Sequence, residues 1–145
     1  MVVVREMLES RDVQAAGRLS LPFEYRQRSR QRATLDSGEE IGLVLPRGLV
    51  LRGGDRLRAS DGRIIEVAAA PEQLAHIEAP NLARIAYHLG NRHVPVQVDE
   101  AFLRILRDHV LEDMVRHLGA RVEHVEGPFE PEAGAYHSHE KHDHG

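Results

Sequence analysis

The segment Phe102-Leu103-Arg104-Ile105-Leu106 decides the fold of the second half of the chain. Its apolar residues continue into a helical series that runs from Val110 to Leu118, which favours one long helix. The same residues also suit a strand that ends before Asp108, with Asp108 as the N-cap of a separate helix. Periodicity alone leaves both interpretations open. A strand here would make the order of elements βαββαβ, the split unit of ferredoxin-like domains.

The elements on either side of this segment have clearer signals. Proline is favoured in the first turn of a helix and glycine just beyond its end, so these residues mark boundaries. In chain order we expect a strand from Gln73 to Glu78, a helix that Pro80 starts and Gly90 stops, a strand from Val94 to Val98, and a last strand from Arg121 to Val125 after a helix that Gly119 ends.

The first half of the chain has the pattern of an all-β domain. Three stretches are apolar or alternate in polarity, as strands do: Val2-Val3-Val4, Leu19 to Arg32 and Ile41 to Leu45. Turn signals recur at short intervals that suit hairpins rather than crossover helices: Asp36-Ser37-Gly38, Pro46-Arg47-Gly48, Gly53-Gly54-Asp55 and Asp61-Gly62. The last of these predicts a type I′ hairpin turn, because Asp-Gly tolerates the two positive φ angles that this turn needs.

Four arginines would share one face of the strand predicted from Leu19 to Arg32, namely Arg26, Arg28, Arg30 and Arg32. Such a stripe could attract phosphate or an acidic partner, although a solvated strand face explains it more simply. Aromatic residues interleaved for base stacking are missing apart from Tyr25, which counts against binding of single-stranded nucleic acid.

Composition excludes several classes of function. The 145 residues include no Cys, so thiolate metal sites and cysteine nucleophiles are ruled out and any metal site must use His and carboxylate. No apolar run is long enough to cross a membrane, and Arg5 and Glu6 interrupt the apolar start, so we expect a cytoplasmic protein. Of the 18 arginines, 10 fall between Arg18 and Arg63. We therefore expect two domains with different roles, divided near Ala68-Ala69-Ala70-Pro71.

The C-terminal residues carry the strongest chemical signal. Four of the ten histidines fall within eight residues, on a segment too polar to fold: His137, His139, His142 and His144. Imidazole suits nickel, copper and zinc, and alternate spacing on a flexible chain lets two or three rings converge on one ion. The alternative is a degenerate expression tag, but polar and charged residues interrupt the histidine run.

One further histidine, His93, lies where a loop is expected to meet a strand. Gly90 offers a left-handed C-cap, so His93 can face outward, although a lone His is usually a surface or packing residue. Its surroundings belong to a set of motifs that together resemble UreE, the nickel metallochaperone family of urease maturation: Asn91-Arg92-His93 with Gln97, Leu118-Gly119, and Pro128-Phe129-Glu130-Pro131-Glu132-Ala133-Gly134-Ala135-Tyr136 leading into the His-rich tail.

The resemblance spans most of the chain and implies an α+β protein. It implies an all-β, partner-binding domain over residues 1–70, a ferredoxin-like βαββαβ domain for metal binding and dimerisation over 71–136, and a disordered His-rich tail over 137–145. It also favours the strand interpretation of Phe102 to Leu106. The implied partners are a second copy of the chain, the urease-assembly GTPase UreG and the urease apoprotein complex.

The resemblance also implies the metal ligands. In the family the histidine that matches His93 is the principal Ni²⁺ ligand and comes from both subunits of a homodimer, which turns one imidazole per chain into two. Zn²⁺ or Cu²⁺ would bind the same ligands. Some relatives carry an auxiliary His-x-His pair that reads Arg107-Asp108-His109 here, so only His109 remains of that site.

Three other functions compete with metal delivery. A zinc hydrolase needs fixed ligands and a general base, and the chain has no His-Glu-x-x-His motif. A nucleic-acid binder that uses the arginine stripe would show steep salt dependence and need no metal. A general buffer for divalent Ni, Zn or Cu would lose nearly all function without the tail, whereas a delivery chaperone would depend more on His93.

Overall fold

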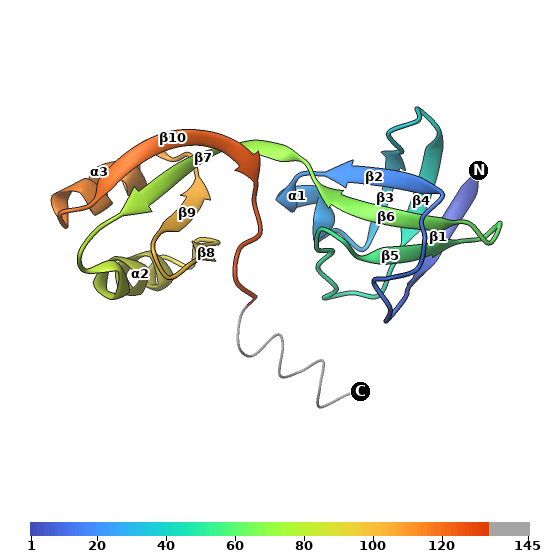
Figure 1. The fold of residues 1–145 in the computed structure, drawn as a ribbon, viewed down its shortest axis with the longest axis horizontal. Coiled ribbons are helices and arrows are strands. Elements are labelled where there is room, and N and C mark those ends of the chain that lie inside the picture. The colour runs from blue at the N-terminus through green and yellow to red at the C-terminus, as the bar shows by residue number, and fades with distance from the viewer. Residues whose placement is uncertain (134–145) are drawn as a thin grey trace. The chain divides into compact units, whose positions relative to one another are not determined.

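The computed structural model describes residues 1–133, so the tail with His137, His139, His142 and His144 lies outside the described residues. The chain divides into two compact units between Ala70 and Pro71. Each unit has its own sheet and its own apolar core, and Figure 1 labels their elements. Within residues 1–133, every helix is too short or too polar to cross a bilayer.

The first unit is built on a six-stranded sheet in the order β2-β6-β5-β1-β4-β3 (Figure 1). Two hairpins, β3-β4 and β5-β6, agree with the turn signals, whereas β1 pairs parallel with β4 and β2 pairs parallel with β6. β1 therefore lies inside the sheet although it comes first in the chain. The strands are β1 (Val2–Met7), β2 (Gly17–Leu21), β3 (Arg30–Thr34), β4 (Glu40–Val44), β5 (Arg56–Ala59) and β6 (Ile64–Ala69).

The stretch from Leu19 to Arg32 is not one strand, and that prediction is wrong. β2 ends at Leu21, and Pro22 then leads into a short helix, α1 (Phe23–Arg26), before β3 begins. Pro22 has no N–H for a sheet ladder, and its carbonyl oxygen accepts hydrogen bonds from the N–H groups of the third and fourth residues after it, at 3.0 and 3.1 Å. The proline therefore ends the strand and starts a helical turn.

The prediction that four arginines share one strand face is wrong for the same reason. Arg26 lies in α1 and is 0% exposed, and its guanidinium donates hydrogen bonds to the carbonyl oxygens of Leu21 and Leu51 at 3.0 and 3.1 Å. Arg28 follows α1 and pairs with Glu24 at 2.9 Å. Of the four arginines, only Arg30 and Arg32 share a strand face.

The turn at Asp61-Gly62 also differs from the prediction. Gly62 has φ of 91°, but Asp61 is not among the residues with positive φ, so this is not a type I′ turn. The N–H of Gly62 donates to the carbonyl oxygen of Ala59 at 2.9 Å, and the N–H of Ala59 donates to that of Arg63 at 2.9 Å. These bonds define a three-residue loop in which glycine occupies the left-handed position at the end of the turn.

The second unit has the element order β7-α2-β8-β9-α3-β10 around a four-stranded antiparallel sheet in the order β10-β7-β9-β8 (Figure 1). The strand interpretation of Phe102 to Leu106 is confirmed, because β9 covers most of it. The elements are β7 (Pro71–Glu78), α2 (Leu82–Asn91), β8 (Gln97–Val98), β9 (Leu103–Leu106), α3 (His109–His117) and β10 (Arg121–Pro128).

Both helices of this unit pack on one face of the sheet. The core combines apolar residues of α2 and α3 at helical spacing with alternate residues of β7 and β9. Burying a Leu, Ile or Val side chain in this core stabilises the fold by about 1.5–3 kcal/mol. The buried residues are Ala75, Ile77, Ile85, Leu89, Leu103, Ile105, Leu111 and Val115.

The predicted ends of α3 are confirmed. The Asp108 carboxylate accepts a hydrogen bond from the N–H of Leu111 at 3.0 Å, and the Glu112 carboxylate accepts one from the N–H of Asp108 at 2.9 Å. Two free N–H groups at the helix start are thereby satisfied. Gly119, with φ of 98°, follows the helix end. A capped start at Asp108 is what separates α3 from the preceding strand.

Two other boundaries differ from the prediction. Gly90 does not stop α2, which continues to Asn91, and the left-handed residue beyond the helix is His93 rather than Gly90. The strand predicted from Val94 to Val98 is reduced to Gln97–Val98. Pro95 cannot donate to a sheet ladder, so regular pairing begins only after it.

Candidate metal centre

His93 occupies an unusual backbone position just beyond α2. Its φ is 58°, and it is the only residue other than glycine with positive φ in the described part of the chain. Its N–H donates to the carbonyl oxygen of Gly90 at 3.0 Å, which closes the helix end. A left-handed conformation costs an L-residue about 1–2 kcal/mol, a strain that glycine would avoid. An exposed histidine held in this conformation is a candidate functional residue.

The His93 ring also differs from the other histidine rings in residues 1–133. It alone makes no hydrogen bond, ion pair or aromatic contact within that range, whereas the other five are engaged as follows: His76 with Arg104 and Glu78, His88 with the Tyr87 ring, His109 with Asp113, His117 with the carbonyl oxygen of Asp113, and His124 with Glu112. Both nitrogens of His93 are therefore available to a ligand from outside the described residues.

His76 illustrates a histidine whose role is structural. Arg104 Nε donates to His76 Nδ1 at 3.0 Å, and because a guanidinium only donates, the proton of the neutral ring lies on Nε2. Nε2 then donates to Glu78 Oε2 at 2.9 Å, and the ring stacks on Phe102 with centroids 4.6 Å apart. The hydrogen bond from His76 holds the pKa of Glu78 below its usual value against the effect of burial. Neither His76 nitrogen is free for a metal.

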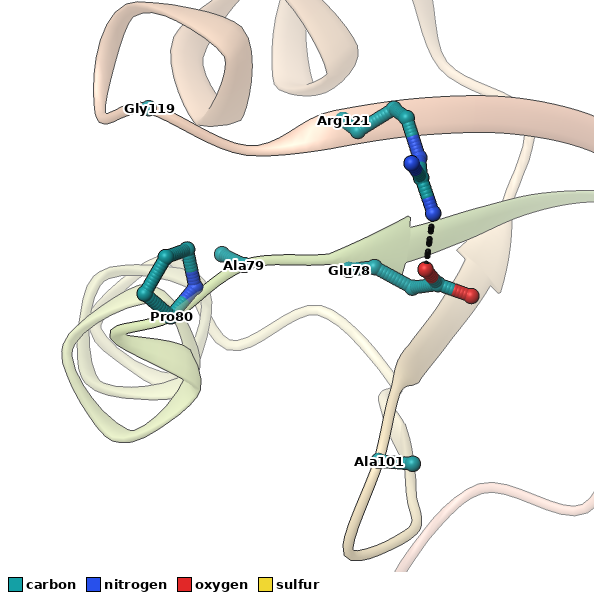
Figure 2. Close-up of a pocket in the computed structure, with 6 residues that line it drawn as sticks. All are labelled: Glu78, Ala79, Pro80, Ala101, Gly119 and Arg121. Carbon is teal, nitrogen blue, oxygen red and sulfur yellow. Dashed lines mark hydrogen bonds and ion pairs between the residues drawn. The ribbon is translucent and has the colours of Figure 1, made fainter.

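The cavity beside this network offers no obvious metal site either. It measures about 360 Å³ and is lined by Glu78, Ala79, Pro80, Ala101, Gly119 and Arg121. Figure 2 shows the Arg121 side chain directed at the Glu78 carboxylate, with which it forms an ion pair. The one carboxylate in this lining is thus already engaged by a guanidinium on β10 and by the His76 ring.

His109 lies at the first position of α3 with its side chain 90% exposed, 3.5 Å from Asp113 Oδ2. It borders a cavity of about 400 Å³ that Glu112 and His124 also line. His124 Nε2 lies 2.6 Å from Glu112 Oε1, so these two groups already satisfy each other. Within residues 1–133, no three His, Asp or Glu side chains are grouped so that one metal ion could be held. Among these residues, His93 and His109 therefore do not belong to one ready-made site of three ligands.

The Glu112 carboxylate is buried, and its environment predicts an effect of acid on stability. Burial alone would raise the pKa of Glu112, but hydrogen bonds from His124 and from the Asp108 N–H, together with Arg116, bring the pKa below its usual value. The charged carboxylate therefore stabilises the fold above the pKa of the unfolded chain, about 4.3, and this contribution is lost as pH falls through the lower pKa of the folded state.

We expect Glu112→Gln to lower the free energy of unfolding near neutral pH by about 1–3 kcal/mol, because the hydrogen bond to His124 is weakened at a buried position. The variant should also lose less stability than the parent as pH falls below about 4. Urea unfolding at a series of pH values measures both effects, with the exposed Glu132→Gln as the matched control. Parallel pH profiles for the parent and Glu112→Gln would contradict the assignment.

An apolar cavity of about 310 Å³ lies beside Val94 and Pro95, the two residues that follow His93 in the chain. It is lined by Val94, Pro95, Ile105, Leu106, Arg107, Asp108 and Leu111. Large apolar side chains are also exposed in this unit, with Tyr87 and Val110 each 64% exposed. Exposed apolar groups in the unit that carries the unpaired histidine are features of a surface that another molecule covers.

Comparison with known proteins gives a consistent result over both units. The C-terminal domain model of the UreE urease accessory protein matches residues 64–145, and the N-terminal domain model matches residues 4–70. The urease accessory protein UreE of Ralstonia nicotianae is 56% identical over 135 residues, which cover 91% of this chain and 64% of that protein. That of Azotobacter vinelandii is 49% identical over 149 residues, which cover 100% of this chain and 89% of that protein.

The UreE of Alkalilimnicola ehrlichii is 54% identical over 121 residues, which cover 81% of this chain and 74% of that protein. The strand-rich first unit and the mixed α/β second unit match the two domains of these urease accessory proteins. The chain belongs to the UreE family, and the resemblance found in the sequence motifs is confirmed.

Proposed function

We propose that this protein is a nickel metallochaperone that binds Ni²⁺ through His93 and delivers it for assembly of the urease active site. The observation that carries the proposal is the His93 ring, which is exposed, held in a left-handed conformation and without a ring partner in residues 1–133. Imidazole nitrogen is a good ligand for Ni²⁺. Membership in a family of urease accessory proteins supports urease as the protein that receives the metal.

A single imidazole binds a transition metal weakly, so the proposal includes a homodimer in which His93 of two chains shares one ion. The apolar cavity beside Val94 and the exposed Val110 support such a contact, because covering them would remove apolar surface from water. Further ligands would come from His109 and from tail histidines, which lie outside the described residues: His137, His139, His142 and His144. Zn²⁺ or Cu²⁺ would use the same nitrogens.

The proposal also divides the roles of the two units. Residues 1–70 would contact partners, residues 71–136 would form a ferredoxin-like domain for metal and dimerisation, and residues 137–145 would be a flexible ligand arm. The βαββαβ order of the second unit supports the ferredoxin-like description. The partners would be UreG and the urease apoprotein in the cytoplasm, with no catalytic role for this chain.

Activation of urease apoprotein in a reconstituted system tests delivery. At limiting Ni²⁺, we expect His93→Ala to reduce urease activation at least tenfold, because the shared ligand is lost, while His109→Ala keeps most of it. The alternative is a divalent-metal buffer, which predicts the opposite order: removal of residues 137–145 would abolish function and His93→Ala would matter little. Full activation by His93→Ala would overturn the delivery role.

A further inference from the structure

The outer edge of the first unit's sheet has main-chain groups that no strand satisfies. β3 is the last strand in the order β2-β6-β5-β1-β4-β3 and pairs only with β4. Along this antiparallel pair, the N–H of Leu45 donates to the carbonyl oxygen of Ser29 at 2.7 Å, and the N–H of Leu35 donates to that of Glu39 at 2.8 Å. Both bonds follow the register that opposes Gln31 to Leu43.

Because hydrogen-bonded residues alternate along an antiparallel ladder, the odd-numbered residues of β3 bond to β4. The main-chain N–H and C=O groups of Arg30, Arg32 and Thr34 therefore point toward the open edge. Within residues 1–133 no backbone group pairs with these three residues on that side, whereas Asp36, the next residue of the same parity, donates its N–H to the carbonyl oxygen of Arg18 in β2 at 2.9 Å. The open stretch of the edge is therefore β3 itself. An open edge of this kind is a template for an added strand.

The same strand carries two unneutralised charges. Arg30 and Arg32 are exposed, lie two residues apart on one face, and make no ion pair in residues 1–133. On β4 they face Val44 and Gly42, and Glu40 of β4 lies opposite Thr34. Other arginines of this unit are paired with carboxylates: Arg11, Arg18, Arg28, Arg56, Arg58 and Arg63.

We propose that β3 docks an extended acidic segment of a partner protein, which adds to the sheet as a seventh strand and places carboxylates at alternate positions against Arg30 and Arg32. Side chains on one face of a strand repeat every second residue, about 7 Å apart, so alternate carboxylates match the spacing of the two arginines. Main-chain hydrogen bonds supply affinity and the charges supply selection. The inference rests on the partner-contact role proposed for the first unit and does not depend on nickel.

The competing explanation is that Arg30 and Arg32 only guard the edge against unwanted strand pairing, as charged residues do on many edge strands. Peptides distinguish the two. The probe is a dye-labelled eight-residue peptide that alternates glutamate and valine, titrated with the full chain and followed by fluorescence anisotropy. Two matched peptides serve as controls: one has the same composition with its glutamates in a block, and the other carries N-methyl groups on alternate amides.

We expect the alternating peptide to bind, and the block and N-methylated peptides to bind at least tenfold more weakly. Arg30→Glu with Arg32→Glu should weaken binding of the alternating peptide at least 30-fold. The charge-matched control, Arg47→Glu with Arg84→Glu, should change it less than threefold, because these exposed residues lie outside β3. Circular dichroism verifies that both double variants are folded.

Equal binding of all three peptides would mean general charge attraction, and would overturn the docked strand. Absence of binding, or equal affinity of the two double variants, would mean that Arg30 and Arg32 only prevent unwanted strand pairing, and would overturn the proposal. Urease activation by the Arg30→Glu, Arg32→Glu protein reports on delivery separately. Loss of peptide binding with normal nickel binding would leave the metal proposal standing, and failed delivery by His93→Ala does not bear on β3.

Discussion

Replacement of His93 by Gly in a chain that ends after Tyr136 is expected to abolish nickel binding while making the protein more stable. Both effects arise from one position. The substitution removes the imidazole proposed as the shared ligand, and it places the residue that best tolerates positive φ where the backbone has φ of 58°. Relief of the left-handed strain should raise the free energy of unfolding by about 1 kcal/mol.

Calorimetric titration with Ni²⁺ and urea unfolding measure the two effects. The shortened parent is expected to be a dimer that binds about one Ni²⁺, since a two-fold axis supplies both histidines. His117→Ala in the same chain is the control and should retain this stoichiometry, because this exposed ring bonds to the carbonyl oxygen of Asp113 and is not a proposed ligand. Because His93→Gly is expected to be more stable than the parent, a loss of binding could not be attributed to unfolding. Unchanged nickel stoichiometry in His93→Gly would contradict the proposed ligand.

Arg26→Met is expected to lower the free energy of unfolding by about 1–3 kcal/mol, whereas Arg28→Met should change it by less than about 0.5 kcal/mol. The Arg26 guanidinium is completely buried and donates to the carbonyl oxygens of Leu21 and Leu51, which would lose a donor. The carbonyl oxygen of Leu21 would keep the N–H of Ala70, at 3.0 Å, so only that of Leu51 would be left unpaired, at a cost of about 1–3 kcal/mol. Arg28 is exposed, 2.9 Å from Glu24 and over the Tyr25 ring.

Urea unfolding followed by circular dichroism compares the two variants, which remove the same charge two residues apart in the chain. Methionine roughly preserves the length of the arginine stem, so the comparison reports mainly on the lost hydrogen bonds. Similar stability of the two variants would mean that the Arg26 contacts contribute little.

The second unit was the more predictable half of the fold. Its boundaries depend on local signals such as the Asp108 cap and Gly119, which act through neighbouring backbone groups. Whether β9 is a strand depends on pairing with β7, more than 25 residues away, so local periodicity could not decide it. Pro95 was a local signal that should have shortened the predicted strand before Gln97.

The first unit shows where local patterns fail. Alternation from Leu19 to Arg32 resembles a strand, but Pro22 starts a helical turn and the core accepts the Arg26 guanidinium because two carbonyl groups are positioned to receive it. Sequence spacing carries no information on those carbonyl positions. The Asp-Gly pair correctly located a hairpin, yet loop length and not composition selected the turn type.

For the candidate site, the sequence indicated that His93 follows a helix, but its strained backbone is a property of the folded chain. The Glu112–His124 pair was not predicted, because it joins α3 to β10 across residues that share no local pattern. Its only sequence signal was a glutamate in the first turn of the predicted helix. Ligands contributed by a second copy or by the tail depend on contacts outside the described residues.

The position of β1 inside the six-stranded sheet has a consequence for how the first unit folds. Its neighbours are β4, which begins at Glu40, and β5, which ends at Ala59, so more than fifty further residues must be synthesised after β1 before both of its edges are paired. Contacts between residues so far apart in sequence slow folding. During that interval both edges of β1, a strand with mostly apolar side chains, stay open to other chains. The nascent unit is therefore more prone to aggregation than the finished one.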